Sequence, residues 1–226
     1  MHENISLDRP WLEFDLQSQL RVLSWSLNRP GFTDSRRIVW REVSNAELPK
    51  HLDVRKWLAG EIASRGISDA VVFLTSRDVR SACHKAVAID DTEVQAVATV
   101  GLLNAERVGH RRDWAGQDWG TINVAVRINH GLSHSGLLEA MSLVVQARTA
   151  AVIDIGIETP FGLATGTGTD CAAVAAPPGD IHFCGLHTEV GEATGRAVYD
   201  AVLQGARAWD TVRQLHRAVL PIRAFQ

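Results

Sequence analysis

The run LEFDLQ at 12–17, followed by LRVLSWSL at 20–27 and RRIVWREV at 36–43, alternates apolar and polar residues. Alternation with a period of two is typical of a strand that buries one face. The turn formers NRPG at 28–31 separate the last two runs, as they would in a β-hairpin. The chain is therefore expected to begin with two or three neighbouring strands.

Further strand patterns follow. AVVFLT at 70–75 is a continuous apolar run of strand length, and the runs 82–89 and 93–103 flank a pair of aspartates that favours a turn. TINVAVRI at 121–128 alternates strongly enough to predict another strand.

Three segments have helical spacing of their apolar residues. They are 52–65, which Gly66 would close as a C-terminal cap, 135–153, and 189–219. Strands therefore come both in hairpins and between helices. We predict an α/β (α+β) fold with a mixed, largely antiparallel sheet and packed helices.

Composition favours one soluble domain over 1–226, because no linker, repeat or low-complexity tract divides the 226 residues. No apolar run approaches the roughly 20 residues that span a bilayer, so no membrane partner is expected. The stretch 1–19 is acidic and contains Pro10, unlike a secretory signal, which predicts a cytoplasmic location. A net charge of -3 with scattered arginines argues against a nucleic-acid partner.

The three cysteines, Cys83, Cys171 and Cys184, show no CxxC spacing, so we expect reduced thiols and no disulfide framework. The chain also has no HExxH motif, so a metal is possible but not indicated, and no metal site is predicted.

The segment GLATGTGTDCAAV at 162–174 crowds glycines and threonines around one carboxylate, Asp170. Glycines let the backbone approach a ligand, and they expose N–H groups that can hold an oxyanion. Thr165, Thr167 and Thr169 add hydroxyl groups. A glycine-rich strand or turn in a tight core would explain the same pattern equally well.

The segment GLHTEVGEATGR at 185–196 places His187 just before a predicted helix, with Glu189, Glu192 and Arg196 inside it. The spacing puts Glu192 on one helix face with Glu189 and Arg196, where an acid, a base and an ion pair could meet. Ordinary helix-start chemistry also explains acidic residues in a first turn and a histidine near its cap.

Asn104 and Asn123 stand in apolar runs, where each amide must bond a neighbouring loop or orient a substrate. A thiol nucleophile is a further alternative, because a cysteine such as Cys171 becomes reactive when a histidine such as His187 lies beside it.

Four motifs in this order resemble the successive signatures of the adenosylcobinamide amidohydrolases over about residues 20–204. They are ATVGLLNAERVG at 98–109, GTINVAVRI at 120–128, LATGTGTDCAAV at 163–174 and CGLHTEVGEATGRAV at 184–198. The resemblance implies hydrolysis of the amide that joins an aminopropanol arm to a corrin-ring propionate, giving adenosylcobyric acid in corrinoid salvage. The corrinoid is then a small-molecule substrate, and no cofactor is expected.

Amide hydrolysis needs a base for water, donors for the oxyanion and an acid for the leaving amine. By position in the motifs, Asp170 or Glu192 is expected as base and His187 as acid. Substrate-binding residues are carried over from the same motifs: Asn104, Thr121, Asn123, Gly166, Thr167, Gly168, Thr169 and Arg196. The backbone of 166–169 and Asn123 would supply the oxyanion donors. Four tryptophans could pack on the macrocycle, although core packing would explain them equally well: Trp25, Trp40, Trp114 and Trp119.

The chain departs from the family pattern at three places. Arg29, Pro30 and Gly31 change the first turn. Gln146 and Arg148 stand where a glutamate and a lysine are expected, and Cys171 replaces a small aliphatic residue. These differences keep two alternatives open: a hydrolase of the same fold acting on another amide, and a corrinoid-binding protein without catalysis. The combination of Asp170, His187 and Glu192 favours an enzyme, and a homodimer is the oligomer that base rates suggest.

Overall fold

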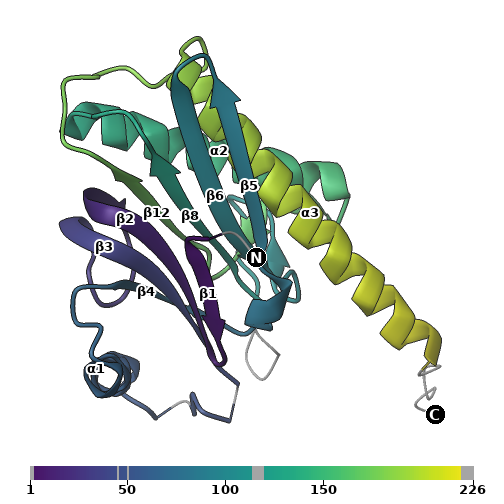
Figure 1. The fold of residues 1–226 in the computed structure, drawn as a ribbon. Helices are drawn as coiled ribbons and strands as arrows, with labels where there is room; N and C mark the ends of the chain where they lie inside the picture. The colour runs from purple at the N-terminus through teal and green to yellow at the C-terminus, as the bar shows by residue number, and fades with distance from the viewer. Residues whose placement is uncertain (1–2, 45, 50, 114–119, 220–226) are drawn as a thin grey trace, which may run out of the picture.

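A computed structural model describes residues 3–44, 46–49, 51–113 and 120–219. Its centre is an eight-stranded sheet in the order β4-β3-β2-β12-β8-β6-β5, with β1 paired to β2 beside this path (Figure 1). The strands are β1 Ile5–Asp8, β2 Trp11–Ser24, β3 Gly31–Glu42, β4 Val71–Thr75, β5 Cys83–Ile89, β6 Thr92–Val100, β8 Ile122–Ile128 and β12 Cys171–Ala176. Among the paired strands of this sheet that the structure describes, β3 with β4 and β12 with β8 run parallel and the other pairs are antiparallel. The prediction of a mixed, largely antiparallel sheet in a single domain is confirmed.

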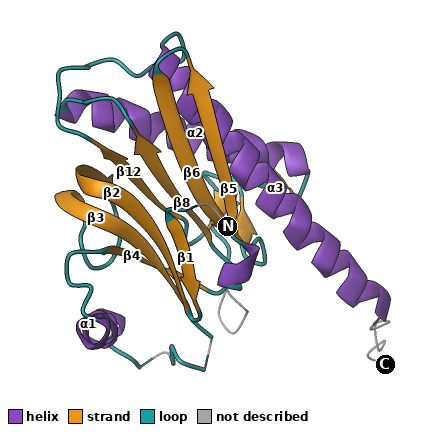
Figure 2. Ribbon diagram, viewed as in Figure 1, coloured by secondary structure: helices purple, strands orange, loops and turns teal. Residues whose placement is uncertain are grey.

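In the described part of the chain three α-helices lie outside the sheet (Figure 2): α1 Val54–Arg65, α2 His134–Ile155 and α3 Glu189–Val219. A short 3-10 helix, Val79–Ser81, lies between β4 and β5. Ser133 caps α2 by accepting a hydrogen bond from the amide of Gly136. Gly66 and Gly156 end α1 and α2 in the left-handed conformation, with φ of 71° and 75°. The helices therefore begin and end within two residues of the positions that apolar spacing indicated.

The helices α2 and α3 cover one face of the sheet. Small side chains such as Ala193, Ala197 and Ala201 let α3 approach β5 and β6 closely, and all three are fully buried. By length and composition alone α2 could cross a membrane. Its buried residues Leu137, Val144 and others join the main hydrophobic core instead, so α2 is a core helix of the α/β domain.

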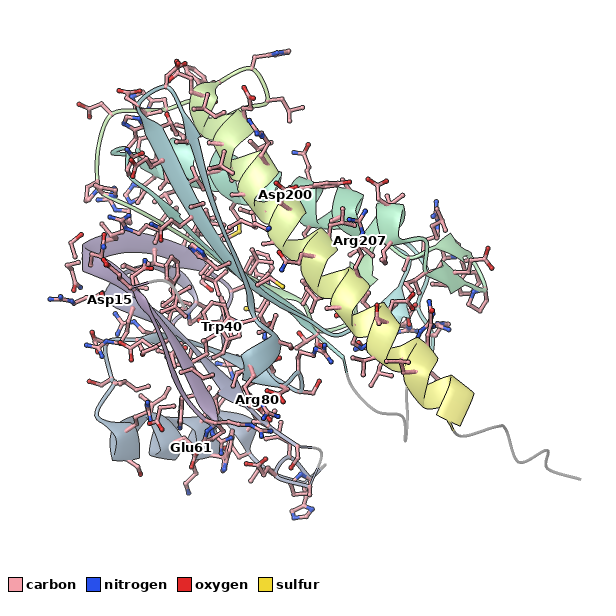
Figure 3. The ribbon with its side chains drawn as sticks, turned by 45° about the vertical axis from the view of Figure 1, so that its right-hand side comes forward. Asp15, Trp40, Glu61, Arg80, Asp200 and Arg207 are labelled. Atoms are coloured by element: carbon pink, nitrogen blue, oxygen red, sulfur yellow. The ribbon has the colours of Figure 1, made fainter. Side chains whose placement is uncertain are left out.

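The other face of the sheet is covered by strands of the same sheet, because β1–β4 bend over β6, β8 and β12. Trp40 lies in this interior, where it is fully buried and meets Phe73 edge to face at 5.2 Å (Figure 3). Hydrogen bonds also cross this interior. In one of them Arg127 Nε donates to the carbonyl of Leu16 at 3.1 Å. Of the two explanations for this tryptophan, core packing is therefore the one that holds for Trp40, because its ring has no exposed surface.

Two short ladders stand apart from the main sheet. β7 Ala105–Glu106 pairs with β11 Gly166–Thr167, and β9 Glu158–Thr159 pairs with β10 Gly162–Leu163. The glycine-rich segment thus contributes to three strands, β10, β11 and β12. β11 directly precedes β12 along the chain, and the ladder β9–β10 is joined to the residue after β7 by a hydrogen bond from Arg107 Nη1 to the carbonyl of Leu163 at 2.9 Å.

Candidate active site

Several chain connections meet at one edge of the sheet. The parallel neighbours β8 and β12 both begin there, with Cys171 opposite Asn123. The antiparallel neighbours β2 and β6 end there, since Ser24 pairs with Ala173 and Val100 with Ile122. The loops that follow β2 and β6 therefore lie beside the glycine-rich loop that leads into β12.

Asp170 is the organising residue of this edge. Its Oδ2 accepts hydrogen bonds from Arg148 Nη1 at 2.7 Å and from the Thr167 amide at 3.0 Å. Its Oδ1 accepts from the Thr167 hydroxyl at 2.5 Å and from the Ile122 amide at 3.1 Å. A carboxylate has about four acceptor positions, so all of them are used by the protein. Asp170 thus joins the loop, β8 and α2.

The charge on Asp170 is held in a nearly dry setting, since its side chain is 7% exposed and that of Arg148 is 16% exposed. Burial raises the pKa of Asp170, while Arg148 and the donors of Thr167 and Ile122 act in the opposite direction. Gly166 makes room for the pair. A Cβ on Gly166 would lie 2.6 Å from Asp170 Oδ2 and 3.4 Å from Arg148 Nη2.

A cavity of about 470 Å³ opens beside this pair. Its charged lining residues are Glu106, Arg107, Arg111, Arg112, Arg148 and Asp170. Two apolar side chains at its mouth are exposed, Trp25 by 44% and Val108 by 78%. His110 also lines the cavity, and its ring stacks on Phe161 with centroids 4.4 Å apart. The cavity is therefore basic inside and partly apolar at its rim.

Asn104 is the predicted substrate-binding residue with an unused donor. Its side chain is fully buried, and its Oδ1 accepts from the amide of Gly120 at 3.0 Å. Its Nδ2 has no hydrogen-bond partner within the part of the chain that the structure describes. A Cβ on Gly168 would lie 3.7 Å from this nitrogen. Because a buried amide without a partner is costly, Asn104 Nδ2 is a candidate donor to a bound carbonyl group.

Thr121, Asn123 and Thr169 hold the loop in place. The Thr121 hydroxyl donates to the carbonyl of Thr169, and the Thr169 hydroxyl donates to the carbonyl of Gly120, each at 2.9 Å. Asn123 Nδ2 donates to the carbonyl of Leu74 at 2.8 Å, while its Oδ1 lies 3.3 Å from the Thr121 hydroxyl. In this structure the Asn123 amide is thus engaged in joining β8 to β4.

His187, Glu192 and Arg196 lie at the opposite end of the sheet. His187 lines a separate cavity of about 420 Å³ together with His130, which follows β8, whereas Asp170 bonds the first residue of β8. β8 has seven residues, and a strand rises about 3.3 Å per residue, so these ends are about 20 Å apart. Glu192 and Arg196 form a surface pair at 3.7 Å with side chains 55% and 59% exposed. The structure does not bring the three predicted catalytic residues together.

The GLHTEVGEATGR segment has a structural role at the start of α3. The Thr188 hydroxyl accepts a hydrogen bond from the amide of Gly191 at 3.0 Å, as an N-cap does. A Cβ on Gly191 would overlap the carbonyl of Gly185. Glu139 of α2 accepts from the amide of Cys184 at 2.6 Å and fixes the preceding loop. Helix-start packing accounts for these residues.

The thiol alternative finds no support in the geometry. Cys171 begins β12 at the edge where Asp170 lies, whereas His187 follows the other end of that strand. Burial raises the pKa of Cys171 to about 12 and that of Cys184 to about 11, so their thiolates are strongly disfavoured. All three cysteines are free.

Two of the departures from the family pattern, Gln146 and Arg148, point in different directions from α2. Gln146 is exposed, whereas Arg148 reaches Asp170.

Asn28 fixes the first turn to β4. Its Nδ2 donates to the carbonyl of Ala70 at 2.8 Å, and its Oδ1 accepts from the amide of Val72 at 3.0 Å. Trp25 donates to the carbonyl of Asp170 at 2.8 Å. Trp114 and Trp119 lie outside the described residues.

Sequence reasoning did not single out Glu106, Arg107 or Arg112 as site residues, although the motif at 98–109 contains Glu106 two positions after Asn104. Within the described ranges, no three His, Cys, Asp or Glu side chains gather closely enough to hold a metal ion.

Comparison with known proteins identifies the family. A family model described as adenosylcobinamide amidohydrolase matches residues 1–214. An uncharacterised protein of Methanocaldococcus jannaschii is 29% identical over 101 residues, which are 43% of this chain and 40% of that protein. The match thus spans two fifths of that relative's length. The crystal structure of the PH0078 protein from Pyrococcus horikoshii has a TM-score of 0.43 and 10% identity, covering 86% of this chain and 76% of the other. The chain belongs to the adenosylcobinamide amidohydrolase family.

Proposed function

We propose that this protein hydrolyses the amide between the aminopropanol arm and the corrin-ring propionate of adenosylcobinamide, giving adenosylcobyric acid and aminopropanol. Membership of the family supports an amidohydrolase. The observation that carries the choice of site is the Asp170–Arg148 pair, which holds the glycine-rich loop at the wall of a cavity of about 470 Å³. The cavity is the proposed place of reaction.

The loop offers donors for the tetrahedral oxyanion. The amides of Gly168 and Thr169 donate no hydrogen bond to any other described residue, and both residues are exposed. Asn104 Nδ2 lies just behind Gly168 with its own donor unused. Prearranged donors of this kind stabilise the charge that develops on the carbonyl oxygen, and one such donor contributes about 10²–10³ in rate in well-studied hydrolases.

The rim of the cavity suits a large apolar ring. Trp25, Val108 and Phe161 are all exposed and stand around the opening or beside it. Broad ligands bury their apolar surface against such side chains, while a few polar groups fix the orientation. In the proposal the macrocycle rests on this rim and its amide arm enters the cavity. The cytoplasm is the proposed location, in keeping with three free thiols.

The test is incubation of the purified protein with adenosylcobinamide, with the products followed by mass spectrometry. Release of aminopropanol together with adenosylcobyric acid is the expected result. Tight, stoichiometric binding with the corrinoid unchanged would contradict hydrolysis and favour a binding protein. If the corrinoid is neither cleaved nor bound, the substrate is a different amide.

A further inference from the structure

Glu106 faces the Asp170–Arg148 pair across the small β7–β11 ladder. It lies directly opposite Gly166 in the register of that ladder. Side chains of opposite residues project to the same face of a ladder, and on that face Gly166 leaves the space taken by Asp170 and Arg148. Glu106 also lines the cavity that these residues line. Two carboxylates therefore border the proposed reaction site.

The two carboxylates differ in what they can do. Asp170 uses both oxygens to hold Arg148, two groups of Thr167 and the Ile122 amide. If Asp170 accepted a proton from water, one of these donors would have to leave, and the buried charge of Arg148 would lose its partner. That loss is expensive in a nearly dry setting. Asp170 is therefore suited to positioning the loop.

Glu106 is fixed on the cavity wall by an arginine. Arg112 Nε lies 3.2 Å from both of its carboxylate oxygens, and Arg112 Nη2 donates to the carbonyl of Ala105 at 2.8 Å. The Glu106 side chain is 15% exposed. Its carboxylate is thus held in a defined orientation and still borders the space where water and substrate meet, as a general base requires.

We propose that Glu106 is the catalytic general base of the amide hydrolysis, an assignment that rests on the proposed function. Glu106 takes one proton from water as the water oxygen bonds to the carbonyl carbon of the amide. The C–N bond of the tetrahedral intermediate then breaks, and the same proton passes from Glu106 to the leaving nitrogen. The products are a carboxylic acid and an amine, and the carboxylate of Glu106 is restored.

This assignment places the chemical groups at one edge of the sheet. Glu106 stands on β7, while the donors for the oxyanion stand on the facing loop at Gly168 and Thr169. No group from the distant end of the sheet is then needed. The proton that the base collects serves the leaving amine, so a separate acid such as His187 is not required.

The test compares Glu106→Gln, Glu106→Ala and wild type by steady-state turnover of adenosylcobinamide. Glu106→Gln is expected to lower kcat by about 100-fold or more, while KM stays within about threefold, because water activation is lost and binding is kept. Added formate should restore part of the kcat of Glu106→Ala in proportion to its concentration, because it supplies a carboxylate to the vacated space. Potassium chloride at equal ionic strength should not.

The matched control is Glu93→Gln, which makes the same change at an exposed position at the other end of the sheet and should keep wild-type kcat. Thermal unfolding monitors the fold of each variant. If Glu106→Gln does not fold, Glu106→Asp takes its place in the test. The shorter side chain keeps a negative charge for Arg112 but draws the carboxylate back from the cavity, and the same loss of kcat is expected.

The outcomes separate the two proposals. If the wild-type protein turns over adenosylcobinamide and the kcat of Glu106→Gln lies within about threefold of the wild-type kcat, the role of Glu106 is overturned and the proposed function stands. Equal activity of Glu106→Ala in formate and in chloride would also overturn it. If the wild-type protein releases no aminopropanol, the proposed reaction itself is contradicted, and the role of Glu106 falls with it.

Discussion

Arg148 on α2 donates a hydrogen bond of 2.7 Å to Asp170, the residue that precedes β12. This bond joins the helix layer to the edge of the sheet at the point where the glycine-rich loop enters it. Arg148 also bonds the hydroxyl of Thr149 at 3.3 Å with a second nitrogen. The planar guanidinium thus makes these two bonds from two nitrogens in fixed directions, whereas a lysine ammonium would have to donate both from one atom.

Asp170→Asn should destabilise the protein by about 3–5 kcal/mol, because it leaves the buried guanidinium of Arg148 without its counter-charge. Arg148→Met should cost a similar amount by stranding the carboxylate. The double variant should lose clearly less than the sum of the two, because the single losses share one cause. Urea unfolding measures all three free energies, and additive losses would contradict direct coupling of the pair.

Gly166→Ala and Gly168→Ala form a matched pair in one loop. The new methyl group at 166 would stand 2.6 Å from Asp170 Oδ2, whereas at 168 the nearest atom outside its chain neighbours is 3.7 Å away. Gly166→Ala is expected to lower the melting temperature by several degrees, and Gly168→Ala to leave it nearly unchanged. Calorimetry of both variants checks this, and equal melting temperatures would show that Asp170 does not need the space at Gly166.

His187→Ala and Glu192→Gln decide whether the far end of the sheet takes part in the chemistry. If His187 or Glu192 transferred protons, turnover would fall by about 100-fold or more. Because one amide bond cannot be within hydrogen-bond reach of groups about 20 Å apart, we expect each variant to keep kcat within about threefold. Steady-state kinetics with adenosylcobinamide distinguishes the two results, and a large loss in a folded variant would return the site to α3.

The thiols should be unreactive in the native protein. The pKa of Cys171 is raised to about 12 and that of Cys184 to about 11, and burial also raises the pKa of Cys83. An unfolded cysteine has a pKa of about 8.5, so its thiolate is far more abundant at pH 8. Iodoacetamide at pH 8 should therefore label the protein slowly when native and at all three cysteines in urea, as mass spectrometry would report. Rapid native labelling of Cys171 would revive the thiol nucleophile.

The regular elements could be predicted because their patterns are local. Apolar spacing with Gly66 at its end predicts α1, and the acidic first turn at Glu189 marks the start of α3. The short strands were not predictable in this way. β7 and β11 have two residues each, and their pairing joins loops that are far apart in the sequence, so no local pattern marks it.

The candidate site was predicted in part. Glycines around Asp170 indicated a loop of special geometry, and the structure places that loop on a cavity wall. The grouping of Asp170 with His187 overlooked a signal in the sequence, because the strand-length run CAAVAA at 171–176 lies between them. The role of Glu106 depends on its register opposite Gly166, which no motif spacing contains.

Part of the cavity wall comes from the β7–β11 ladder, which shares no pairing with the eight-stranded sheet, and from the segment 107–112 that follows β7. The length or composition of β7, β11 and the segment 107–112 can therefore change while the register of the main sheet stays as it is. Asp170 and Arg148 would remain fixed to that sheet and to α2 during such changes. The fold thereby separates a fixed anchor, the Asp170–Arg148 pair, from a part of the cavity wall whose sequence can change without disturbing the sheet.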